Sequence, residues 1–182
     1  MMMHLELVRA RLEGGAPDGG KVRESLDVIG SEIRRLDRVV QGFLRFVRPQ
    51  ELSLKPVDVN LLSQGVAALL EAEWRPAGIR FVLALDPECP RVSGDEELLR
   101  QALLNLVVNA CQAMPEGGAV TLATSRPAPE WVAMSVTDEG SGIAPENRDR
   151  IFSLYYTTKP DGSGIGLSLV YRIVHMHDGA ID

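Results

Sequence analysis

A repeating pattern of hydrophobic positions runs through residues 22–48. Apolar side chains return in alternating steps of four and three residues, with Arg, Glu, Asp and Gln between them. This heptad spacing predicts a long helix that buries one stripe against other helices and ends at Pro49, which cannot donate a backbone hydrogen bond. The heptad positions are Val22, Leu26, Ile29, Ile33, Leu36, Val40, Phe43 and Val47.

A shorter segment with similar spacing, Met1–Leu12, comes before Glu13–Gly20, a stretch rich in Gly that also contains Pro and cannot continue a helix. The two segments together predict an antiparallel helical hairpin over residues 1–48. Two helices with one apolar stripe each do not enclose a core, and pairing with a second copy as a four-helix bundle would bury both stripes. We therefore expect a homodimer, and a hairpin that packs on its own globular domain is the alternative.

Residues 58–182 show a mixed pattern, which a linker at 49–57 joins to the hairpin. Asp58 and Asp95 are each typical N-caps in front of a helical pattern. The order of helices and strands predicts an α+β domain with helices over one face of a sheet. The expected elements are helices at Val59–Trp74, from Asp95 to Met114 and from the last glycines to His175, and strands at Ile79–Leu85, Val120–Thr124 and Trp131–Thr137.

Composition narrows the class of partner. The chain has 182 residues, 45% of them hydrophobic, and a formal net charge of −6, which argues against binding to nucleic acid. No run of apolar residues is long enough for a transmembrane segment in this chain. Cys89 and Cys111 lack the spacing of a disulfide framework or a zinc site, so we expect a reducing, cytoplasmic setting, although a parent protein could still be membrane-anchored.

The first candidate site pattern is a pair of asparagines, Asn105 and Asn109, which fall on one face of the predicted helix and interrupt an apolar surface. An amide oxygen is a suitable ligand for Mg²⁺ completed by nucleotide phosphates. The alternative is that these amides cap loops or face water.

The second pattern is Asp138 followed by Gly140 and Gly142, directly after a predicted strand. A carboxylate beside backbone without Cβ atoms could accept the exocyclic amine of a flat base such as adenine. A common turn composition is the alternative, and no Walker lysine follows.

The third pattern covers Ile151–Lys159 and the glycines at 162, 164 and 166. Two threonines and Lys159 precede the glycines, which lead into a helix. A mobile polar lid that ends at a helix N-terminus would favour an anion such as a triphosphate. A dinucleotide-binding loop is disfavoured, because no strand leads into these glycines.

These segments resemble, in order, the N, first-glycine, F and second-glycine boxes of the histidine kinase ATP-binding domain. Ser31–Pro49 also resembles the second hairpin helix of nitrogen-regulatory-type sensor kinases. The resemblance implies a two-layer α/β sandwich of the Bergerat type that binds ATP and Mg²⁺. It also implies a protein histidine kinase of two-component signalling, which transfers phosphoryl to a histidine and then to an aspartate on the receiver domain of a response regulator.

The same resemblance implies roles for individual residues. Asn109 would hold the magnesium, Asp138 the adenine amine, and Phe152 and Tyr156 would anchor the lid. Asn105 stands where related gyrase and chaperone ATPases carry a glutamate base, and an amide cannot take up that proton, so slow hydrolysis is expected. The implied catalytic residues are Asn105, Asn109 and Lys159. The implied nucleotide-binding residues are Asn109, Gln112, Ala113, Asp138, Gly140, Gly142, Ile143, Phe152, Tyr156, Thr157, Thr158, Lys159, Gly162, Ser163, Gly164, Ile165, Gly166 and Leu167.

The sequence departs from the family at both ends. The phosphoacceptor pattern H-E-x-x-x-P does not occur, and His4 lacks the proline, so we expect a chain that cannot autophosphorylate by itself. His175 and His177 are expected to be structural, and further strands are expected beyond Asp182. Three alternatives remain: a dimerisation scaffold that no longer binds ATP, an ATPase of the gyrase or chaperone type, and a serine kinase of the anti-sigma-factor type.

Overall fold

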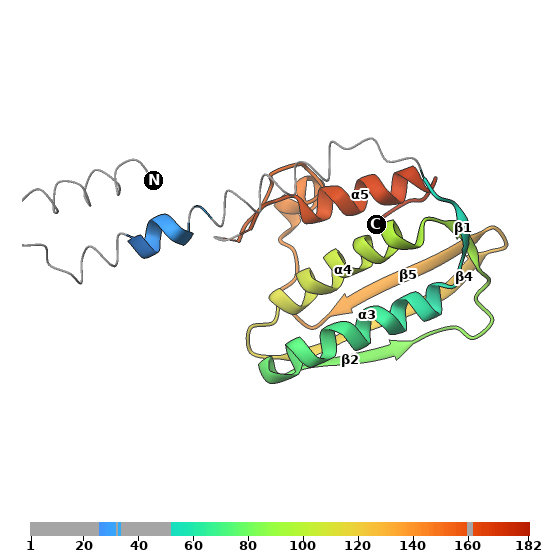
Figure 1. Ribbon diagram of the computed structural model, residues 1–182, viewed down its shortest axis with the longest axis horizontal. Coiled ribbons are helices and arrows are strands. Elements are labelled where there is room, and N and C mark those ends of the chain that lie inside the picture. The colour runs from blue at the N-terminus through green and yellow to red at the C-terminus, as the bar shows by residue number, and fades with distance from the viewer. Residues whose placement is uncertain (1–25, 32, 34–51, 160–161) are drawn as a thin grey trace, which may run out of the picture. The chain divides into compact units, whose positions relative to one another are not determined.

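The computed structural model describes residues 26–31, 33, 52–159 and 162–182 (Figure 1). The chain forms two units, residues 1–48 with 157–165 and residues 49–156 with 166–182. In the first unit, residues 26–31 and 33 are helical, as the heptad pattern predicts. The rest of the predicted hairpin lies outside the described residues.

A three-stranded sheet underlies the second unit, in the order β2-β4-β5. Its strands are β2 (Ile79–Ala84), β4 (Gly118–Ala128) and β5 (Trp131–Asp138). β2 runs parallel to β4, whereas β5 runs antiparallel to it. Since Ile79 pairs with Gly118 and Val120 pairs with Asp138, β5 ends where the other two strands begin. Asp138 therefore lies at a well-defined end of the sheet.

Helices α3 (Val59–Trp74) and α4 (Glu96–Gln112) lie over one face of this sheet, and α5 (Gly166–Met176) packs against α4 (Figure 1). The carboxylates of Asp58 and Asp95 accept two backbone hydrogen bonds each at the starts of α3 and α4, so both predicted N-caps are confirmed. The fold is the expected arrangement of helices on one side of a mixed sheet.

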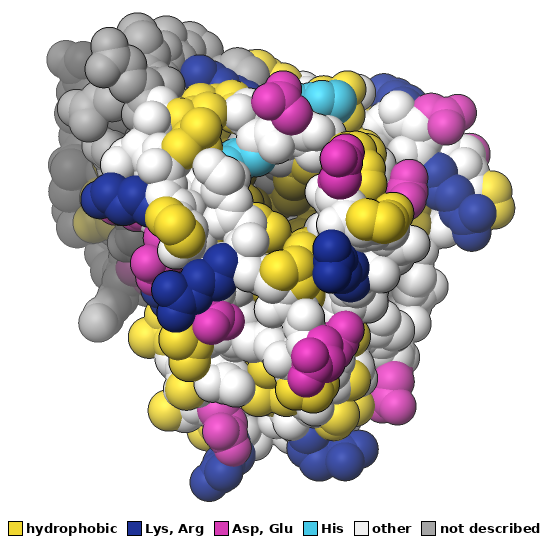
Figure 2. Space-filling model, turned by 90° about the vertical axis from the view of Figure 1, so that its right-hand side faces the viewer, with side chains coloured by type: hydrophobic (Ala, Val, Ile, Leu, Met, Phe, Trp, Pro, Cys, Tyr) yellow, Lys and Arg dark blue, Asp and Glu magenta, His cyan; other side chains and the backbone are white. Residues whose placement is uncertain are grey.

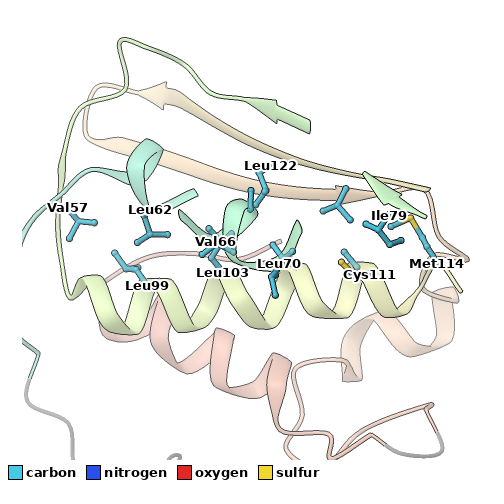
Figure 3. Packing of buried hydrophobic residues seen from close by; sticks show 14 residues of the cluster. Val57, Leu62, Val66, Leu70, Ile79, Leu99, Leu103, Cys111, Met114 and Leu122 are labelled. Carbon is cyan, nitrogen blue, oxygen red and sulfur yellow. The ribbon is translucent and has the colours of Figure 1, made fainter. Parts of the chain in front are cut away.

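The main core lies between α3, α4 and the sheet (Figure 3). Leu62 and Val66 of α3 meet Leu103 of α4 and Leu122 of β4, and all four are at most 2% exposed. Burying each such side chain contributes about 1.5 to 3 kcal/mol. A second cluster joins α4 to α5 through Leu98, Ala102, Leu169, Val170 and Ile173. α4 is therefore the element that both cores share.

Several boundaries differ from the expectation. β1 (Lys55–Val57) pairs antiparallel with β3 (Val92–Gly94), and neither strand was predicted, so part of the expected linker at 49–57 is a strand. β2 ends one residue earlier than expected, β4 extends to Ala128, and β5 includes Asp138. α4 ends at Gln112 rather than Met114, and α5 begins at Gly166 and ends at Met176. Two short 3₁₀ helices, η1 (Arg75–Ala77) and η2 (Pro145–Arg150), complete the unit.

Candidate nucleotide-binding site

One face of α4 organises the candidate site. Its first half carries Leu98 and Ala102, which pack against α5. Continuing in steps of three or four residues along the same face, the second half carries Asn105, Asn109 and then Ala113, the C-cap of the helix. The side chains on this face are therefore apolar in the first half of α4 and become polar at Asn105 and Asn109.

Asn105 is on α4 and lies beside the first residue of α5. Its Nδ2 donates to the backbone oxygen of Gln101 at 2.9 Å, in the preceding turn of α4. A Cβ on Gly166, the first residue of α5, would come within 3.3 Å of the Asn105 Oδ1 and 3.8 Å of the Asn109 Nδ2. Both asparagines, which are half-buried, therefore lie beside the backbone that opens α5. An amide in this place can accept or donate, but it cannot act as a base.

The other end of the same face meets the loop after β5. A Cβ on Gly140 would lie 2.7 Å from the carbonyl oxygen of Ala113 and 2.8 Å from its Cβ, so only glycine fits without a shift. The Gly140 backbone N–H donates to the Asp138 Oδ1 at 2.9 Å. That bond fixes the Asp138 carboxylate at the end of β5, while the residue stays exposed to an incoming ligand.

Glu139 joins the same loop to the start of β4. Its Oε2 accepts the backbone N–H of Ala119 at 2.9 Å, one residue beyond the last β4–β5 pair. Gly142 has a φ of 69°, and a Cβ there would meet nothing within 4 Å. Ile143 is 48% exposed, although it is apolar. The loop thus offers open space and an apolar surface beside the carboxylate, which suits a flat base.

Phe152 and Tyr156 of the F box contact different neighbours. Phe152 lies with its ring centroid 5.7 Å from that of Tyr171 on α5. The Tyr156 hydroxyl donates to the Asn147 Oδ1 at 2.5 Å, and the Arg150 guanidinium lies 4.5 Å from the centre of the Tyr156 ring. Asn147 and Arg150 were not predicted as contacts of Tyr156, because nothing in their local pattern indicates a tyrosine that follows them.

Residues 157–159 and 162–165 belong to the other unit. The Lys159 backbone N–H donates to the Thr157 Oγ1 at 3.1 Å, and the Gly162 N–H donates to the Lys159 oxygen at 3.1 Å. A Cβ on Gly162 would overlap the Thr157 Oγ1, and Gly164 has a φ of 66°. Both positions require glycine for reasons visible within the segment.

The remaining predicted residues are placed as follows. Gln112 is exposed in the last position of α4, and Leu167 is half-buried in the first turn of α5. Thr158 is exposed, whereas Ser163 is half-buried and its Oγ accepts the Ile165 backbone N–H at 3.4 Å. The structure thus brings Asn105, Asn109, Ala113, Asp138, Gly140 and Gly166 together around α4.

Charged side chains of both signs cover the opposite end of the molecule from this corner. On that face, which Figure 2 shows, basic and acidic side chains are interspersed and form no continuous basic stripe. Within the described ranges, no three His, Cys, Asp or Glu side chains gather as a metal site. No helix in the described part of the chain could span a membrane.

The fold and this corner define an α/β domain built around a polar helix face, with a carboxylate and close-fitting glycines at one end of its sheet. Residues 94–182 match the family described as "Histidine kinase-, DNA gyrase B-, and HSP90-like ATPase". The chain belongs to this family, among the catalytic ATP-binding domains of sensor histidine kinases.

Three relatives illustrate the similarity. Sensor histidine kinase ZraS of Escherichia coli K12 is 37% identical over 166 residues, which cover 91% of this chain and 36% of ZraS. Full-length ShkA, solved in complex with AMPPNP, has a TM-score of 0.70 and 36% identity over 93% of this chain and 37% of its own. The mycobacterial sensor histidine kinase MprB has a TM-score of 0.62 and 31% identity, over 70% of this chain and 82% of its own. The chain thus spans about a third of the length of ZraS.

Proposed function

We propose that this chain binds ATP with Mg²⁺ and positions the γ-phosphoryl group for transfer to a protein histidine. The observation that carries the proposal is the single face of α4 on which Asn105 and Asn109 lie beside Gly166, and Ala113 lies against Gly140. One helix face thereby joins a carboxylate suited to adenine with amides suited to a metal and phosphates. Family membership supports the same assignment.

Each residue then has a defined task. Asp138 accepts the adenine amine through a carboxylate that Gly140 orients. Asn109 supplies an amide oxygen for Mg²⁺, and Lys159 is assigned to the phosphates by its place in the family's pattern. Asn105 cannot remove a proton from water, which favours transfer to a histidine over hydrolysis. In the transfer, the bond from the γ-phosphorus to the bridging oxygen breaks, a bond to the histidine nitrogen forms, and ADP leaves.

Calorimetric titration with ATP, with and without Mg²⁺, tests this proposal. Asp138→Asn should weaken ATP binding about tenfold or more, because the amide can no longer give a charge-assisted bond. Asn109→Ala should remove most of the magnesium dependence. Glu130→Gln, on the exposed turn at the opposite end of β5, is the matched control and should bind like wild type. No nucleotide binding by wild type would refute the proposal and favour the degenerate scaffold.

Hydrolysis distinguishes the proposal from an ATPase of the gyrase or chaperone type. We expect slow turnover by wild type and faster turnover by Asn105→Glu, which introduces a base on α4 beside the first residue of α5. Rapid hydrolysis by wild type would instead support the ATPase alternative.

We further propose that residues 1–48 form a dimerisation hairpin in front of the ATP-binding domain, whose first strand is β1, and that the phosphoryl group passes to a response regulator receiver domain. Two positions of the predicted seam, Leu26 and Ile33, are each 53% exposed. Exposed apolar side chains at heptad positions suit a helix that packs against another helix. Sedimentation velocity of Leu26→Lys/Ile33→Lys should give a monomer and wild type a dimer. Asp27→Lys, off the seam, is the control, and a monomeric wild type would refute the hairpin dimer.

A further inference from the structure

Glu139 completes the hydrogen bonding at the end of the sheet. The Gly118 N–H of β4 donates toward β2, to the Gly78 oxygen at 3.2 Å. Because successive N–H groups of a strand point to opposite sides, the next one, that of Ala119, points toward β5, which ends at Asp138. It donates to the Glu139 Oε2 at 2.9 Å. A carboxylate therefore takes the place that a backbone carbonyl would hold in a longer strand.

This hydrogen bond is made to a part of the backbone that is itself held. The Gly117 N–H donates to the Met114 oxygen at 3.0 Å, just after α4, so β4 starts with backbone bonds to the end of α4 and to the start of β2. A Cβ on Gly118 would lie 2.7 Å from the Met114 Sδ and 3.5 Å from the Glu139 Oε2. The Glu139 side chain thus ties the loop after β5 to backbone that two other elements fix.

The loop that Glu139 ties down orients the carboxylate of Asp138. The Gly140 N–H donates to the Asp138 Oδ1 at 2.9 Å. Asp138 is exposed, and an exposed side chain can otherwise move among several rotamers. The direction of its carboxylate therefore depends on the position of the Gly140 N–H, directly after Glu139. Releasing the Glu139 side chain should let that N–H shift and the carboxylate turn with it.

From this geometry we infer that Glu139 is a positioning residue for the base of the nucleotide, acting through Asp138. Glu139 does not touch the ligand; its hydrogen bond to β4 sets where the Asp138 carboxylate meets the exocyclic amine. The inference rests on the proposed binding of ATP. An acceptor that is already oriented loses less entropy when the base arrives. The expected signature is a loss of affinity that depends on the exocyclic amine, whereas a general loosening of the fold would weaken all nucleotides alike.

The experiment measures the binding of Mg-ATP and of Mg-purine riboside triphosphate, whose base lacks the exocyclic amine, by calorimetry. Glu139→Ala should weaken ATP binding about fivefold, the value of one hydrogen bond, and change binding of the analogue less than about twofold. Glu139→Gln keeps an acceptor oxygen at the same reach and should bind both within about twofold of wild type. Glu139→Asp withdraws the acceptor by one carbon–carbon bond, about 1.5 Å, and should resemble Glu139→Ala. Glu130→Ala changes an exposed glutamate in the turn before β5 and is the matched control.

Three results would overturn the inference: equal losses for ATP and the analogue in Glu139→Ala, ATP binding by that variant that matches Glu130→Ala, or a Glu139→Gln variant as weak as Glu139→Ala. Hydrogen exchange in the nucleotide-free protein separates the inference from the proposed function. The Ala119 and Gly140 amides should exchange faster in Glu139→Ala than in wild type, and at the wild-type rate in Glu139→Gln. Unchanged exchange in Glu139→Ala refutes the positioning role even if wild type binds no nucleotide.

Discussion

Gly140 and Ala113 approach so closely that a Cβ at position 140 would lie 2.7 Å from the Ala113 carbonyl oxygen. The contact joins the loop after β5 to the C-cap of α4, and thus joins the carboxylate of Asp138 to the helix that carries both asparagines. Because Ala113 contributes backbone to the contact, a larger residue at 140 cannot be accommodated by turning a flexible side chain.

Gly140→Ala should consequently destabilise the protein by about 1 to 3 kcal/mol, the usual cost of overpacking, and should abolish ATP binding. Gly142→Ala is the matched comparison, since a Cβ there meets nothing and the cost is that of a positive φ alone, about 1 kcal/mol. Urea unfolding and calorimetry measure the two effects. Equal stability of the two variants would contradict the steric account.

Asp95 makes the fold sensitive to acid. Burial alone would raise the pKa of Asp95, but the backbone N–H groups of Ser53, Leu98 and Glu97 donate to its carboxylate and bring that pKa below its usual value. A carboxyl with a lowered folded pKa contributes stability above its unfolded value of about 3.9, and that stability is lost as the pH falls through the folded pKa.

Urea unfolding of wild type and Asp95→Asn, from pH 7 down to pH 3, measures this contribution. Wild type should be the more stable at neutral pH, and the difference should shrink below about pH 4, because the amide retains an N-cap acceptor but not the charge. Glu130→Gln serves as the control. A difference that stays constant with pH would mean that the Asp95 charge does not contribute.

The thiols of the two cysteines should react with a thiol reagent at different rates. Cys111 is 1% exposed, and burial is the main reason that the pKa of its thiol is raised. Cys89 is half-buried in the connection after β2, and its pKa is also raised, by burial and then by the Asp86 and Asp58 carboxylates. With a thiol reagent at about pH 9, Cys89 should react rapidly and Cys111 only when the protein opens. Cys111→Ser should remove the slow phase alone, and two rapid phases in wild type would contradict the burial of Cys111.

The sequence predicted the elements that carry a strong local signal. α3 was placed from Val59 to Trp74 because an N-cap precedes a long apolar stripe, and the structure has the same limits. β1 and β3 were missed because a three-residue strand shows no period, and their pairing joins residues far apart in the chain. β4 was cut short because Pro127 was read as a turn. Beyond Ala123, β4 no longer pairs with β2, so a proline there leaves no hydrogen bond to that strand unmade.

The candidate site divides in the same way. Asp138 and Asn109 were assigned roles because their boxes stand in the family's order, and those roles stay a prediction. The structure shows that Gly140 and Gly166 lie close to α4. Asn147 was not found, because its hydrogen bond to Tyr156 depends on how η2 folds back, and no spacing encodes that. His177 was expected to be structural. Its hydrogen-bond partner, the Asp95 backbone N–H, lies 82 residues away in the sequence, so no local pattern indicates this contact.

His177 joins the end of α5 to the start of α4. The Asp95 backbone N–H donates to its Nε2 at 2.9 Å, and its Nδ1 lies 2.7 Å from the Ile173 oxygen, so the proton belongs on Nδ1. His177→Ala should cost about 1 to 3 kcal/mol, since it leaves the partly buried N–H of Asp95 without its acceptor. His175→Ala, two residues earlier on α5 and exposed, loses only a ring contact with Tyr171 and should cost less than about 1 kcal/mol. Urea unfolding of both variants at pH 8 provides the comparison, and a His177 variant no weaker than the His175 variant would mean that the hydrogen bond to Asp95 does not stabilise the fold.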